Sequence, residues 1–124
     1  MTLSILYVDD EPDLLEIATF ALELDPEIEL RTCESGPVAL AMLKRWKPDL
    51  LLLDMMMPGM DGPSVHVAAR DLCSGAMPAV VYITARAERA EIARLMGLGA
   101  SGVIAKPFDP MSLAAQLREF AGHG

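Results

Sequence analysis

The chain has 124 residues, of which 52% are hydrophobic and 23% charged, a composition that favours one globular domain with an ordinary core. Eighteen acidic residues against ten lysines and arginines give a formal net charge of -8, which argues against direct binding to nucleic acid. The two cysteines, Cys33 and Cys73, fit neither a disulfide framework nor a zinc site. Since no signal peptide pattern or membrane-length apolar run occurs, we expect a single cytoplasmic domain over residues 1–124.

Short apolar runs alternate with segments of helical periodicity along the chain. Strands are expected over residues 4–8, 28–33, 50–53, 79–83 and 103–105. Helices are expected over residues 13–24, from Ser35 to about Trp46, over 63–72 and 85–96, and from Asp109 onwards. Pro12 suits the first turn of the first helix, while Ser35 and Asp109 are good N-caps.

Alternating strands and helices predict an α/β fold with a parallel sheet, right-handed crossovers and five helices on its two faces. Four consecutive leucines, Leu50 to Leu53, are typical of a central strand that is buried on both faces. Residues 28–33 alternate between apolar and polar, and residues 103–105 are few, so these two strands belong at the edges. The doubly wound strand order 2-1-3-4-5 satisfies all of these expectations.

Polar residues follow the ends of four expected strands. With this order, Asp9, Asp10, Asp54 and Thr84 lie on neighbouring strands about 4.8 Å apart, and Lys106 lies one strand further. Carboxylates this close repel one another unless a cation compensates, and an all-oxygen ligand set favours Mg²⁺. Mg²⁺, an ammonium and a hydroxyl stabilise a phosphoryl group in transfer, and a carboxylate can accept it as an acyl phosphate. We therefore expect phosphoryl chemistry here.

The chain also resembles a known family through four short motifs, in the correct order at four expected strand ends. They are Val8-Asp9-Asp10-Glu11, then Asp54 with Met57-Pro58-Gly59-Met60-Asp61-Gly62, then Thr84-Ala85, and finally Lys106-Pro107-Phe108. Together they resemble the receiver domain of bacterial two-component response regulators, the single-domain chemotaxis type included. The resemblance covers nearly the whole chain and implies a flavodoxin-like fold.

The resemblance implies a cytoplasmic signalling phosphoprotein that takes part in a phosphorelay. Asp54 would accept a phosphoryl group from a histidine kinase or phosphotransfer protein. Asp10, Asp54 and the backbone carbonyl of Met56 would bind Mg²⁺, while Asp9 would act mainly through water. Thr84 and Lys106 would contact the phosphoryl oxygens.

The resemblance also implies how the domain acts. It would be no enzyme beyond assisting its own phosphorylation and dephosphorylation. In the family the bond between the lysine and Pro107 is usually cis. Partners are expected on the face formed by the helix over 85–96, the strand over 103–105 and the last helix, and phosphorylation could produce a homodimer. No contact with nucleic acid or membrane is expected.

One position departs from the family pattern, and two others occupy places that influence the lifetime of the acyl phosphate. Val103 stands where many members carry a tyrosine or phenylalanine whose ring turns inward on phosphorylation. Either Thr84 and the following loop signal in another way, or the conformational response is small. Met56 and Arg86 occupy positions that tune hydrolysis of the acyl phosphate. Bulk at Met56 could obstruct an attacking water, which predicts a long-lived phosphoryl form.

Three other functions were weighed against a phosphorylated switch. A pseudo-receiver would work as an unphosphorylated interaction module, but the intact acids and lysine argue against it. An aspartate phosphatase typically has a second aspartate two residues after the nucleophile, where this chain has Met56. A flavin phosphate would be repelled by the acidic strand ends.

The remaining notable side chains have ordinary structural explanations. His66 and His123 are expected at the surface, and Trp46 in the core or at its rim. The methionines Met55, Met56, Met57 and Met60 are expected to pack under a turn rather than to bind a soft metal.

Overall fold

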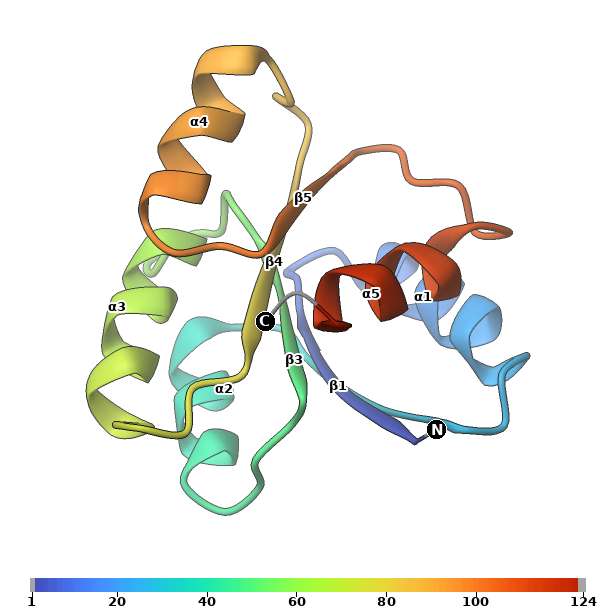
Figure 1. Cartoon of the computed structure of the whole chain (residues 1–124), viewed down its shortest axis with the longest axis horizontal. Coiled ribbons are helices and arrows are strands. Elements are labelled where there is room, and N and C mark those ends of the chain that lie inside the picture. The colour runs from blue at the N-terminus through green and yellow to red at the C-terminus, as the bar shows by residue number, and fades with distance from the viewer. Residues whose placement is uncertain (1, 123–124) are drawn as a thin grey trace.

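A five-stranded parallel sheet forms the centre of the computed structural model, which describes residues 2–122 (Figure 1). The strand order is β2-β1-β3-β4-β5, which confirms the predicted arrangement. The strands are β1 (Leu3–Val8), β2 (Ile28–Cys33), β3 (Leu50–Asp54), β4 (Ala79–Thr84) and β5 (Gly102–Ala105).

Five helices cover the two faces of this sheet, with α1 and α5 on one face and α2, α3 and α4 on the other (Figure 1). The helices are α1 (Pro12–Glu23), α2 (Gly36–Leu43), α3 (Gly62–Leu72), α4 (Arg89–Gly97) and α5 (Leu113–Gly122). Strand β3 shows why the sheet needs both layers. Leu50 and Leu52 enter the core beneath α1 and α5, whereas Leu51 and Leu53 enter the opposite core, and all four are fully buried.

Two helices begin later than predicted because local hydrogen bonds hold the preceding residues in turns. Helix α4 begins at Arg89 rather than near residue 85, since Thr84 Oγ1 accepts the Arg86 N–H at 3.0 Å. Helix α5 begins at Leu113, because the Asp109 carboxylate accepts the Met111 N–H at 2.9 Å and caps a turn instead of the helix.

Helix α2 begins at its predicted cap and ends earlier than predicted. Ser35 accepts the Val38 N–H, which confirms it as the N-cap. The helix ends at Leu43, and Trp46 lies beyond it, partly buried against the core, with the Arg31 guanidinium carbon 4.1 Å from the centroid of its ring. The prediction that Trp46 lies in the core or at its rim is therefore confirmed.

The expectation for His66 was wrong. His66 is only 2% exposed, because it lies on the buried side of α3 together with Val65 and Ala69. The ring can be buried there since its Nδ1 lies 2.8 Å from the hydroxyl of Tyr82, a fully buried residue of β4. His123 lies outside the described residues.

The methionine cluster packs largely as expected. Met55 and Met57 are buried in the core and Met60 is partly buried against it, whereas Met56 is 69% exposed. Over residues 2–122, the longest helix falls well short of the apolar length that would cross a membrane.

The turn from β3 into α3 tolerates no side chain at Gly62. A Cβ there would lie 2.6 Å from the Asp54 carbonyl oxygen, whereas a Cβ at Gly97 in α4 would meet nothing within 4 Å. We predict that Gly62→Ala lowers the free energy of unfolding by about 1–3 kcal/mol, because the backbone must shift. Gly97→Ala should leave it unchanged or raise it by up to about 1 kcal/mol. Urea unfolding measures both, and equal effects of the two variants would contradict this packing.

Candidate functional site

The carboxyl ends of β1, β3, β4 and β5 meet at one edge of the sheet, as the strand order predicted. Val8 pairs with Leu53, so that Asp9 and Asp54 follow side by side. The Lys106 N–H donates to the Thr84 carbonyl at 2.8 Å, which ties the end of β5 to the end of β4. The bond between Lys106 and Pro107 is cis, as predicted.

The Lys106 ammonium group lies among three carboxylates. Its Nζ is 2.9 Å from Glu11 Oε2, 3.1 Å from Asp54 Oδ1 and 3.4 Å from Asp9 Oδ2, and only 15% of its side chain is exposed. Burial lowers the pKa of Lys106, but the hydrogen bonds to Glu11 and Asp54 and the charge of Asp9 outweigh this and hold the pKa above its ordinary value. The lysine therefore stays charged.

Glu11 is the member of this group that the sequence reasoning missed as a site residue. Carboxylate oxygens of Asp9, Glu11 and Asp54 all lie within 4.8 Å of one another, so the three could hold a metal ion; we call these three residues the acid cluster. The available signal was position alone, because Glu11 immediately follows the predicted pair of aspartates in the loop before α1.

Asp54 is the carboxylate of the acid cluster that lies at the end of β3. It is almost fully buried, and burial together with the neighbouring charge of Asp9 raises the pKa of Asp54 to about 7, although Lys106 opposes the rise. Its Oδ1 accepts from Lys106 at 3.1 Å and from the Met56 N–H at 3.4 Å. Its Oδ2 is buried and accepts no hydrogen bond from any described residue. A buried carboxylate oxygen without a partner, beside two further carboxylates, suits a hard divalent cation or a covalent bond.

The remaining predicted site residues lie around this centre. Asp10 is half-buried, and its carboxylate is not a member of the acid cluster. Thr84 is buried at the end of β4, and its hydroxyl oxygen accepts the Arg86 N–H at 3.0 Å. Met56 directs its N–H toward Asp54, while its side chain is exposed beside the site.

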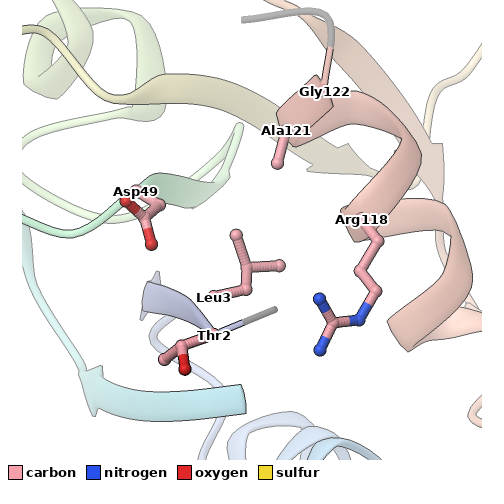
Figure 2. Close-up of a pocket in the computed structure, with 6 residues that line it drawn as sticks. All are labelled: Thr2, Leu3, Asp49, Arg118, Ala121 and Gly122. Carbon is pink, nitrogen blue, oxygen red and sulfur yellow. The ribbon is translucent and has the colours of Figure 1, made fainter. Parts of the chain in front are cut away.

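A concavity lies at the opposite edge of the sheet, where the strands begin (Figure 2). It measures about 470 Å³ and is lined by Thr2, Leu3, Asp49, Arg118, Ala121 and Gly122. The Asp49 carboxylate accepts from the backbone N–H of Ser4 at 2.9 Å and from its hydroxyl at 3.0 Å, and Arg118 donates to Asp25 at 2.9 Å. The polar side chains of this concavity therefore bind other parts of the chain and have a structural role. We place the functional site at the acid cluster instead.

The fold is a doubly wound α/β domain with acids and a lysine at the carboxyl ends of its strands, and comparison with known families identifies the class of protein. Residues 5–118 match the response regulator receiver domain. The chain therefore belongs to the receiver domains of two-component response regulators.

Individual relatives agree with this assignment. The chain is 34% identical over 114 residues to the DNA-binding response regulator MtrA of Mycolicibacterium smegmatis, covering 92% of this chain and 48% of that protein. It is 40% identical over 120 residues to the response regulator PleD of Caulobacter vibrioides, covering 95% of this chain and 26% of that protein. The chain thus spans half or less of the length of these curated relatives.

Solved structures give the same fold. The signal receiver domain of the response regulator NarL from Mycobacterium tuberculosis superposes with a TM-score of 0.88 at 28% identity, covering 99% of this chain and 98% of that one. The chemotaxis response regulator CheY4 of Vibrio cholerae gives a TM-score of 0.84 at 24% identity, covering 97% and 99% of the two chains, which supports the fold.

The raised pKa of Asp54 predicts a pH-dependent cost to stability when no metal is bound. Between the ordinary pKa of 3.8 and about 7, the unfolded chain has lost a proton that the folded protein keeps, so the parent's free energy of unfolding falls as the pH rises. Asparagine does not titrate. We predict that the stability of Asp54→Asn relative to the parent grows by roughly 2–4 kcal/mol between pH 4 and pH 8 in EDTA.

Urea unfolding across this pH range measures the difference. Asp71→Asn, at an exposed position of α3, is the matched control and should show no such growth. A relative stability of Asp54→Asn that is constant with pH would contradict the environment described for Asp54.

Proposed function

We propose that this receiver domain accepts a phosphoryl group on Asp54 from a histidine kinase or phosphotransfer protein, in a reaction that requires Mg²⁺. The observation that carries the proposal is the state of Asp54, whose Oδ1 is held by Lys106 while its buried Oδ2 has no described hydrogen-bond partner. One oxygen is thus oriented by a cation, and the acceptor capacity of the other is unused.

In the proposed step, a carboxylate oxygen of Asp54 forms a bond to the phosphorus of a phosphohistidine. The bond between phosphorus and the histidine nitrogen breaks, and the nitrogen keeps its electron pair. Lys106, which lies 3.1 Å from the Asp54 carboxylate, would pair with a phosphoryl oxygen. The Thr84 hydroxyl, buried at the neighbouring strand end, would donate to another oxygen.

The donor set fits Mg²⁺ because it consists of oxygen ligands with net negative charge. The acid cluster offers Asp9, Glu11 and Asp54, and the family resemblance adds Asp10 and the Met56 carbonyl. When bound, Mg²⁺ supplies positive charge that stabilises the phosphoryl oxygens during transfer. The protein's own residues orient the acceptor and exclude water, since Asp9 and Asp54 are both buried.

The output is proposed to be a change in partner binding at the face formed by α4, β5 and α5, with homodimerisation as one form of it. Lys106 and Thr84 directly join β5 and β4 at the site, so a phosphoryl group that engages both would act on this face. Val103 of β5 pairs with Tyr82, whose hydroxyl contacts His66. A valine has no ring to rotate, so the readout is proposed to use the loop after Thr84.

We propose that the domain assists only its own phosphorylation and dephosphorylation and does not turn over another substrate. The exposed Met56 side chain beside Asp54 would hinder an attacking water and lengthen the life of the acyl phosphate. A pseudo-receiver that works unphosphorylated is less favoured, because it would leave three acids around a largely buried lysine without a use.

The direct test is the intact mass of the protein after incubation with acetyl phosphate and Mg²⁺. We predict an increment of one phosphoryl group in the parent and in the exposed-site control Asp71→Asn. The increment should be absent in Asp54→Asn and when EDTA replaces Mg²⁺. A parent that gains no phosphoryl group, or an Asp54→Asn variant that gains as much as the parent, would contradict the proposal.

A further inference from the structure

Tyr7 of β1 has a hydroxyl that contacts the acid cluster from the protein interior. The residue is fully buried among the side chains beneath α1 and α5, and its hydroxyl donates to Asp9 Oδ2 at 2.6 Å. Its neighbours on this face of the sheet, Ile5 and Leu52, are equally buried without any polar atom. Burial alone therefore does not require a hydroxyl at position 7, and the contact with Asp9 needs its own explanation.

The two oxygens of Asp9 have three donors in the described structure. Oδ1 accepts the Glu11 N–H at 3.0 Å, while Oδ2 accepts from Tyr7 at 2.6 Å and lies 3.4 Å from Lys106 Nζ. A carboxylate has about four acceptor positions, so these contacts reduce the capacity of Asp9 for direct binding of a metal ion. Each oxygen of Asp9 thus already accepts a hydrogen bond from the protein itself, unlike Asp54, whose Oδ2 has no described partner.

Tyr7 and Lys106 share the same oxygen of Asp9, and Tyr7 makes the shorter contact. Lys106 correspondingly lies nearer to Glu11, at 2.9 Å, and to Asp54, at 3.1 Å, than to Asp9. Burial and the hydrogen bond to Asp9 hold the pKa of Tyr7 far above its ordinary value, so its hydroxyl remains a donor.

We propose that Tyr7 is a positioning residue of the acid cluster, whose hydroxyl occupies Asp9 Oδ2, keeps Asp9 as a water-mediated partner of the bound cation and leaves Lys106 for Asp54. The inference rests on the proposed function, because it assumes that a divalent cation binds among these carboxylates. Tyr7 acts through Asp9 and touches neither the cation nor the phosphoryl group.

Removing the hydroxyl should change two properties in opposite directions. In Tyr7→Phe, Asp9 Oδ2 loses its nearest donor, so the negative charge at the cluster is less compensated and Mg²⁺ should bind about threefold more tightly or better. Lys106 should move toward Asp9 and away from Asp54, so phosphorylation at saturating Mg²⁺ should slow about fivefold or more. A purely structural loss would weaken both properties together.

The test measures the Mg²⁺ dissociation constant by calorimetry and the phosphorylation rate by intact mass with acetyl phosphate, using the full chain. Tyr82→Phe is the matched control, since it removes an equally buried hydroxyl that contacts His66 rather than a carboxylate, and it should change neither value. A third comparison is between Asp9→Ala and the double variant that also carries Tyr7→Phe. These two proteins should have the same Mg²⁺ affinity, because Tyr7 acts through Asp9.

Unchanged or weaker Mg²⁺ binding in Tyr7→Phe would overturn the inference while leaving the proposed function intact. So would an equal change in Tyr82→Phe, or a Tyr7→Phe effect that persists in Asp9→Ala. A parent protein that binds no Mg²⁺ would overturn both this inference and the metal dependence of the proposed function.

Discussion

The structure depends on one electrostatic constraint, the placing of three carboxylates around a single, largely buried ammonium group. Asp9, Glu11 and Asp54 would repel one another if Lys106 did not lie within 3.4 Å of each. One positive charge does not neutralise three negative ones. The site therefore retains an excess of negative charge, which adds to the effect of burial in raising the pKa of Asp54. This excess is what makes the site suited to a divalent cation.

The fold supplies the constraint through strand order and through packing on both faces. Because β1 and β3 are neighbours with Val8 opposite Leu53, Asp9 and Asp54 must follow side by side, and β5 brings Lys106 from the far edge. The leucines of β3 enter the two cores and so fix the position of Asp54 at the end of this strand. Charges that would separate in water are thus held together by apolar burial, which provides the larger part of the folding free energy.

The sequence predicted this backbone arrangement well, because strand periodicity and burial determine it. Leu50 to Leu53 marked the central strand, and the rule that parallel strands end at one edge placed Asp54 near Lys106. Side-chain partners that cross between elements were harder to predict. Glu11 was missed as a site residue because its contact with Lys106 joins positions remote in sequence. His66 was misplaced because only the folded structure brings the Tyr82 hydroxyl to its ring.

The measurement that tests this account most directly is the stabilisation by Mg²⁺ of Lys106→Met compared with the parent, from urea unfolding at pH 8 with EDTA or with Mg²⁺. If Lys106 and a bound cation compensate the same carboxylates, Mg²⁺ must raise the free energy of unfolding of the parent, and must raise that of Lys106→Met by more. An equal or smaller increment in Lys106→Met, or no increment in either protein, would contradict the account.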